Sequence, residues 1–288
     1  MMLRLPRCVA TALTLVVVAT SLPAQAPKLS FPAPSPEGAI KQRVGVTDIE
    51  VVYSRPSARG RKIFGGLLPY GDVWRTGANT ATKITFSSPV KIGGREVPAG
   101  SYALFSIPGE SEWTVILNRV TGEWGAYSYN EASDALRVKV PSVALGQAVE
   151  TFTIDVNDVR TESATLNLIW EKTRVPVKID VDVVKPVVAQ IEAVMVPGAK
   201  IDENTYFAAA MFYYDNRLDL NKARTWVEAA TAGPKAPFYM LHGKAKILAK
   251  LGDKAGAIAA ARQSIAAADG PPKAEYIRLN EALISSLK

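Results

Sequence analysis

The sequence predicts an α+β protein in two parts, an antiparallel β-sandwich domain followed by an α-helical segment of hairpins. Two features predict this fold. Apolar residues alternate with polar ones through much of residues 39–185, which is the period of a strand with one buried face. After residues 185–186 alanine becomes abundant and the apolar period changes to that of a helix. The chain accordingly divides into a signal peptide over residues 1–26, a proline-rich linker over 27–38, the β-sandwich over 39–185 and the helical segment over 186–288.

The N-terminal residues have the pattern of a secretory signal. Arg4 and Arg7 precede residues 9–20, an uncharged run that is too short to span a bilayer as a helix. Small residues favour cleavage after Ala26 or after Ala24. We therefore expect an exported protein, periplasmic or secreted, with no transmembrane segment in the mature chain. Because the single cysteine lies before the apolar run, the mature chain should contain no disulfide, thiolate nucleophile or thiolate metal site.

The strands of the sandwich are predicted from short runs of β-branched and aromatic residues. In the clearest run Val175, Val177 and Ile179 alternate with polar residues up to residue 183. Further runs lie at residues 49–54, 82–86, 102–107, 113–117, 136–140, 152–156 and 164–170. Turn sequences such as Gly93-Gly94 separate them, and no helical stretch lies between them. This spacing favours an antiparallel sandwich or barrel over a parallel sheet, and of the two we prefer the sandwich.

The helical segment contains an internal repeat. Similar residues recur 34 positions apart, as in the stretches 223–230 and 257–264 and in the pair Met211 and Ala245. This offset is the period of the tetratricopeptide repeat. The segment therefore resembles two such repeats, the first of them degenerate, with a closing helix over residues 272–288. An ordinary bundle of helical hairpins is the alternative, because two repeats are fewer than a stable solenoid usually needs.

A long connection over residues 55–80 carries a family resemblance. It has no periodicity, and structureless connections of this length tend to be functional. Its motifs, and those that follow along the chain, are Gly60-Arg61, Phe64-Gly65-Gly66, Pro69-Tyr70-Gly71, Val73-Trp74-Arg75-Thr76-Gly77-Ala78-Asn79, Pro98-Ala99-Gly100-Ser101-Tyr102, Ile107-Pro108-Gly109, Trp113, Trp124-Gly125, Tyr129 and Asp134. Over residues 39–185 the chain resembles the domain of unknown function 2911 family. The resemblance implies an exported bacterial protein with a β-rich fold, and it implies no reaction.

The same connection contains a candidate site for an anion. Four arginines and one lysine share it with a single carboxylate. Guanidinium groups grip carboxylates or phosphates through paired hydrogen bonds, and aromatic rings offer flat surfaces to sugars. We predict that the connection folds over one end of the sandwich and lines a pocket where Arg61 lies with Arg75 as the anion anchor, Asn79 as a polar contact, and Trp74 and Tyr70 as walls. The structural alternative is that Trp74 fills the core, Arg75 pairs with a carboxylate and Asn79 caps a turn.

A second and weaker candidate lies further along the chain. Glu123 and Asp134 flank an aromatic stretch that includes Trp124 and Tyr129. Two carboxylates beside aromatic rings are what glycoside cleavage needs. If they line one cleft, this stretch would belong to a carboxylate-dependent hydrolase of an envelope polysaccharide or of peptidoglycan.

Several kinds of chemistry are not expected. The only histidine, His242, falls in the helical segment, so the β domain can form neither a Ser-His-Asp triad nor a multi-histidine metal site. No glycine group has the Lys-Ser or Lys-Thr that follows in a P-loop. We expect no cofactor and no bound metal. The net charge of +7 is spread without a basic run, which argues against nucleic acid as a partner.

These observations favour a non-catalytic envelope module. Its sandwich would bind a small anionic or glycan ligand, or a protein partner, and its helices would provide a second surface for proteins. The hydrolase and a purely structural or assembly role remain alternatives, and whether the protein is an enzyme stays open.

Overall fold

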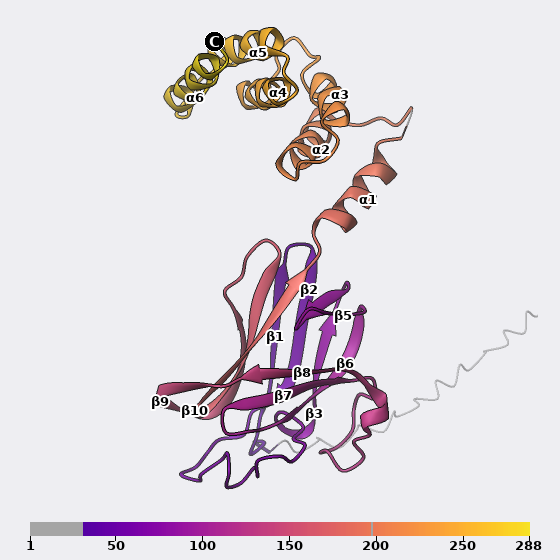
Figure 1. The fold of residues 1–288 in the computed structure, drawn as a ribbon, viewed down its shortest axis with the longest axis vertical. Coiled ribbons are helices and arrows are strands. Elements are labelled where there is room, and N and C mark those ends of the chain that lie inside the picture. Colours follow the sequence, from indigo (N-terminus) through magenta and orange to yellow (C-terminus); the bar gives the residue numbers. More distant parts are fainter. Residues whose placement is uncertain (1–30, 197) are drawn as a thin grey trace, which may run out of the picture. The chain divides into compact units, whose positions relative to one another are not determined.

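The fold is seen in a computed structural model that describes residues 31–196 and 198–288 (Figure 1). The predicted signal peptide, its cleavage site and the first residues of the predicted linker lie outside the described residues. No helix in the described part of the chain is long and apolar enough to cross a membrane.

Two antiparallel sheets form the first part of the described chain, as predicted. The six-stranded sheet has the order β1 (Glu37–Val44), β2 (Thr47–Ser54), β3 (Ala78–Phe86), β6 (Gly100–Ile107), β7 (Glu112–Asn118) and β8 (Asp134–Pro141). The four-stranded sheet has the order β5 (Arg95–Val97), β4 (Val90–Ile92), β10 (Ser163–Val181) and β9 (Val143–Asn157). Neighbours along the chain are mostly neighbours in a sheet, joined by short turns except between β2 and β3 and between β7 and β8.

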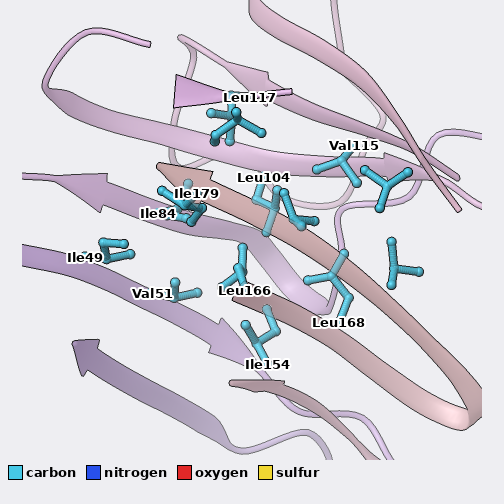
Figure 2. Packing of buried hydrophobic residues seen from close by; sticks show 14 of the residues in the cluster. Ile49, Val51, Ile84, Leu104, Val115, Leu117, Ile154, Leu166, Leu168 and Ile179 are labelled. Atoms are coloured by element: carbon cyan, nitrogen blue, oxygen red, sulfur yellow. The ribbon is translucent and has the colours of Figure 1, made fainter. Parts of the chain in front are cut away.

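The core lies between the inner faces of the two sheets. Figure 2 shows Leu104 and Val115 of the first sheet facing Leu166 and Leu168 of the second. Alternation explains this arrangement, because successive side chains of a strand point to opposite faces. The pattern in β10 that predicted a strand accordingly buries Val175, Val177 and Ile179.

Some strands were not predicted from the sequence. β1 begins at Glu37, so the last two residues assigned to the linker are part of a strand. β4 and β5 form a short hairpin whose turn is Gly93-Gly94, with φ of +57° and +75°. A two-residue hairpin turn with both residues left-handed strongly favours glycine, which explains the pair.

The second part of the described chain is helical. Its helices are α1 (Val184–Val194), α2 (Glu203–Asp215), α3 (Leu220–Ala230), α4 (Phe238–Lys250), α5 (Lys254–Ala267) and α6 (Lys273–Ser286). Aspartates cap α2, α3 and α5 through their side-chain oxygens, which accept hydrogen bonds from the first backbone N–H groups. α2 packs on α3 and α4 packs on α5, so two hairpins are present, and α6 is the expected closing helix. Their tetratricopeptide-like character stays a prediction.

Candidate functional site

Residues 55–77, which we call the plug segment, join the two sheets at one end of the sandwich. On β9, the Ala58 N–H donates to the Glu150 carbonyl and the Phe152 N–H donates to the Pro56 carbonyl, both at 2.8 Å. On β6, Trp74 and Ser106 exchange two backbone hydrogen bonds of 2.7 and 2.8 Å. The plug segment lies at the lower end of the sheets in Figure 1. It thus has partners for its backbone, as a long connection needs.

Trp74 belongs to the hydrophobic core, where only 5% of the residue is exposed. Its ring stacks on Trp170 with centroids 5.9 Å apart and meets the edge of Phe152 at 5.0 Å. Its indole N–H donates to the Gly77 carbonyl at 2.9 Å. The prediction of Trp74 as the wall of a ligand pocket was therefore wrong, and the structural alternative for this residue is correct, because its faces are covered by other rings.

Arg61 and Tyr70 lie apart from that core. The Arg61 guanidinium donates to the carbonyls of Ala58 and Ser57, at 2.9 and 2.7 Å, and so closes its own turn. Tyr70 is 41% exposed, and its ring covers Gly65 so closely that a Cβ there would lie 2.7 Å from a ring carbon. The plug segment does not gather these two side chains around Trp74. A ligand role for either residue stays a prediction.

Asn79 lies where the connection that holds the first candidate site meets the stretch around Trp124 that holds the second. Its φ is +57°. The pairing of β3 with β2 shifts register here, so Asn79 lies in a β-bulge. The Asn79 side-chain amide donates to the Ser54 hydroxyl at 3.2 Å, and the Asn79 carbonyl accepts from the Gly125 N–H at 3.0 Å. Beside it, Thr80 is paired with Trp124 in an isolated antiparallel bridge. The bulge thus brings the second candidate stretch against the first.

Residues 119–130, which we call the outer-face segment, cover a small apolar cluster on the outer face of the six-stranded sheet. The cluster consists of Ala81, Ala103, Phe105 and Ile116, with Ala126 and Tyr129 packed against it. The Tyr129 ring meets the Phe105 ring edge to face at 5.1 Å. This contact fixes one end of the outer-face segment to the sheet.

Asp134 is the centre of a polar network beside Tyr129. Its side chain is 7% exposed and accepts hydrogen bonds from the Tyr129 hydroxyl at 2.6 Å and the Asn118 amide at 2.8 Å. Arg137 lies 3.4 Å from the same carboxylate and 2.6 Å from Glu131. Burial, and then the hydrogen bond to Asp134, raise the pKa of Tyr129 above its ordinary value. Arg137 was not singled out in the sequence, although it alternates with the apolar residues of β8 and so had to face outward.

Trp124 and Tyr127 carry the exposed aromatic rings of the outer-face segment. Trp124 is 65% exposed and Tyr127 is 87% exposed. The backbone around Trp124 is nevertheless held, because the Ala81 N–H donates to the Glu123 carbonyl at 2.9 Å on one side and Gly125 bonds Asn79 on the other. The result is a fixed backbone that presents rings to solvent.

Arg75 carries a shielded hydrogen-bond donor. Its Nε is shielded from solvent and has no hydrogen-bond partner among the described residues. The predicted alternative, in which Arg75 pairs with a carboxylate of the sandwich, finds no support in the ion pairs of the described chain.

Two hollows of the described chain lie elsewhere. One, of about 720 Å³, is lined by β4, the end of β10 and the start of α1, and the other, of about 800 Å³, lies between α3, α4 and α5. Neither contains a candidate residue. Within the described residues no three metal-binding side chains come together either. The candidate residues thus lie outside both hollows, and those with exposed side chains form a surface.

Fold and site together define a two-sheet β-sandwich protein with a helical extension and an aromatic surface segment. Residues 35–179 match the model of the family described as "Protein of unknown function (DUF2911)", and the chain belongs to this family. No curated protein and no solved structure matches the chain.

Proposed function

We propose that the sandwich is a non-catalytic binding module for a glycan and that the outer-face segment is its binding surface. The observation that carries the proposal is the pair of exposed rings, Trp124 and Tyr127, on a segment whose backbone is bonded to β3. Covering apolar surface that is exposed to water lowers the free energy, so two large exposed rings within four residues are candidates for contact with a ligand.

The geometry suits a sugar ring. A flat aromatic face offers contact area to the apolar C–H face of a sugar, while nearby polar groups can bond its hydroxyls. The backbone pairs on either side of Trp124 reduce the conformational entropy that binding would otherwise cost.

The arrangement of the carboxylates supports binding over hydrolysis. A glycosidase needs one carboxylate that can exchange a proton with the substrate. Asp134 instead accepts hydrogen bonds at both oxygens and lies beside Arg137. Three side chains of the fold thus occupy the Asp134 carboxylate, which suits a structural role.

The wider role that we propose is that of an exported envelope protein. The N-terminal charge and apolar pattern support export, and the helical hairpins would offer a separate surface to a protein partner.

The proposal can be tested by calorimetric titration of residues 27–288 with oligosaccharides of glucose, N-acetylglucosamine and galacturonic acid. The double variant Trp124→Ala, Tyr127→Ala should weaken binding by at least about tenfold, the effect of losing a binding hot spot. The control Tyr239→Ala removes a ring that is 37% exposed in α4 and should change nothing. If wild-type protein binds none of these sugars, or if the double variant binds as well as wild type, the proposal is wrong.

A further inference from the structure

We propose that the glycan bound by this surface is acidic and that Arg75 binds its carboxylate. This inference rests on the proposed function and deepens it. It begins from a cation that the fold positions at the candidate surface and leaves without a counter-ion.

The strand alternation places Arg75 on the outer face. Trp74 points into the core and pairs with Ser106 of β6, so the next residue, Arg75, lies opposite Phe105 and on the other side of the sheet. Val73, on the far side of Trp74, confirms the alternation because it packs on the outer cluster with Phe105. Arg75 therefore shares its face with Phe105, the residue that Tyr129 also contacts.

Other arginines near this end of the sandwich are engaged. Arg55 donates to the Phe152 carbonyl and to the Thr153 hydroxyl, at 3.2 and 3.0 Å. Arg61 donates to two carbonyls of its own turn, and Arg137 is held between Glu131 and Asp134. By contrast, the Nε of Arg75 is shielded from solvent and has no hydrogen-bond partner, and none of the ion pairs among the described residues includes Arg75.

An arginine in this state is costly to the fold alone. A shielded donor without an acceptor loses its bond to water and gains none in return, so such groups in native proteins call for an explanation. A carboxylate from solvent cannot reach the shielded Nε, but its two oxygens match the two terminal nitrogens of the guanidinium, which are not among the shielded donors. A charge-assisted pair there would offset part of the cost of the Arg75 side chain.

The anchor and the aromatic rings lie along the same stretch of chain. The Arg75 carbonyl accepts from the Thr82 N–H at 3.2 Å, and Thr80, paired with Trp124, is two residues earlier in β3. The N–H groups of Ala81 and Thr82 point to opposite edges of β3, so the segments of Trp124 and Arg75 flank this strand and lie about two strand spacings, or about 10 Å, apart. A short oligosaccharide can therefore reach from the Trp124 side of this stretch to the Arg75 side, which makes an acidic sugar unit the class of ligand that this surface fits.

The test compares two ligands that differ only in charge. Residues 27–288 would be titrated with trigalacturonate and with its methyl ester, in wild type and in Arg75→Gln, Arg75→Lys and the control Lys83→Gln, an exposed cation of β3. We expect wild type and Lys83→Gln to bind the acid about tenfold or more tighter than the ester, the usual effect of a charge-assisted hydrogen bond. Arg75→Gln should bind both ligands equally and as weakly as wild type binds the ester, and Arg75→Lys should keep part of the preference.

The outcomes separate the two proposals. If wild type binds acid and ester equally and Trp124→Ala abolishes both, the glycan module stands and the acidic ligand is wrong. If Arg75→Gln weakens the binding of both ligands to the same extent, Arg75 has a structural role and the inference is overturned. The inference is also overturned if thermal unfolding shows that Arg75→Gln does not fold, while Arg75→Lys folds but has lost the preference for the acid. If wild type binds neither ligand, the acidic ligand is wrong. If wild type also binds none of the glucose and N-acetylglucosamine oligosaccharides, the glycan module is wrong as well.

Discussion

The plug segment and the outer-face segment are two connections of one sheet with similar residues and opposite outcomes. Both are rich in glycine and aromatic residues, and both are held by backbone bonds to neighbouring strands. Yet Phe64 and Trp74 of the plug segment are 6% and 5% exposed, whereas Trp124 and Tyr127 of the outer-face segment are 65% and 87% exposed. An aromatic residue in a long connection is thus ambiguous until its surroundings are known.

The two segments differ in the apolar surface against which they pack. The plug segment meets the open end of a sandwich, where Trp113, Phe152 and Trp170 leave room for further rings. The outer-face segment meets a small cluster that Tyr129 and Ala126 already cover. Rings beyond that cluster have no apolar surface left to join, so burial stabilises the first segment and solvent surrounds the rings of the second.

The largest effect on stability is expected from a substitution in the plug segment. Trp74→Ala should destabilise the protein by about 3 to 5 kcal/mol, because it leaves a cavity among four aromatic rings and removes the bond to the Gly77 carbonyl. Chemical denaturation followed by tryptophan fluorescence and circular dichroism measures this change. A loss below about 1 kcal/mol would mean that the plug does not belong to the core, and the contrast between the two segments would disappear.

The fold could be predicted wherever one face of a strand is buried. The alternation is regular in β8 and in each half of β10, before and after the irregularity near Glu171, because one side of each meets the core. The predicted runs at 49–54, 82–86 and 102–107 all lie within strands. β1 was missed because its residues are mostly exposed or half-buried, so the alternation is weak. β4 and β5 have three residues each, too few for a period to show.

The candidate site could be predicted only in part. The sequence suggested both stretches, but it could not show that Trp74 meets Trp170, because contacts between residues so far apart depend on how the two sheets close. Nor could it show the bulge at Asn79 that joins the stretches, since asparagine with positive φ also occurs in ordinary turns. The exposure of Trp124 and the isolation of Arg75 are likewise properties of the assembled sheet.

A smaller effect is expected where the outer-face segment is fixed to the sheet. Asp134→Ala should cost about 2 to 3 kcal/mol, since Tyr129 and Asn118 lose an acceptor and Arg137 loses one of two carboxylates. The matched control is Asp48→Ala, which breaks the solvent-exposed pair with Arg43 and should cost clearly less than Asp134→Ala. Equal losses in the two variants would show that the Asp134 network adds nothing beyond a surface ion pair.

The hydrogen bond from Tyr129 to Asp134 predicts that the stability of the protein depends on alkaline pH. The pKa of Tyr129 is raised by burial and by Asp134, so the folded protein keeps its proton where an unfolded chain, with a tyrosine pKa near 10, releases it. The stability that this proton contributes is complete below pH of about 10 and is lost as the pH rises, by at most about 1.4 kcal/mol per pH unit and less where solvent reaches the hydroxyl. Urea unfolding at pH 8 and pH 11 should show a smaller fall for Tyr129→Phe than for wild type. Identical falls would place the Tyr129 hydroxyl in solvent.

The smallest effect on stability is expected for Trp124, and it gives the sharpest comparison with Trp74. Trp124→Ala removes a ring that is mostly in water, while the bonds that hold the segment run through backbone groups of Glu123 and Gly125 and survive the change. The free energy of unfolding should therefore change by no more than about 0.5 kcal/mol, as for other surface substitutions. Two tryptophans of one domain would then differ by several kcal/mol in their contribution to folding, and the proposed function assigns the opposite order to their contribution to binding. Melting of the two variants side by side, with and without the oligosaccharide that wild type binds, measures both quantities. If Trp124→Ala destabilises the fold as much as Trp74→Ala does, the Trp124 ring has a structural role, and the proposal that the outer-face segment is a binding surface is wrong.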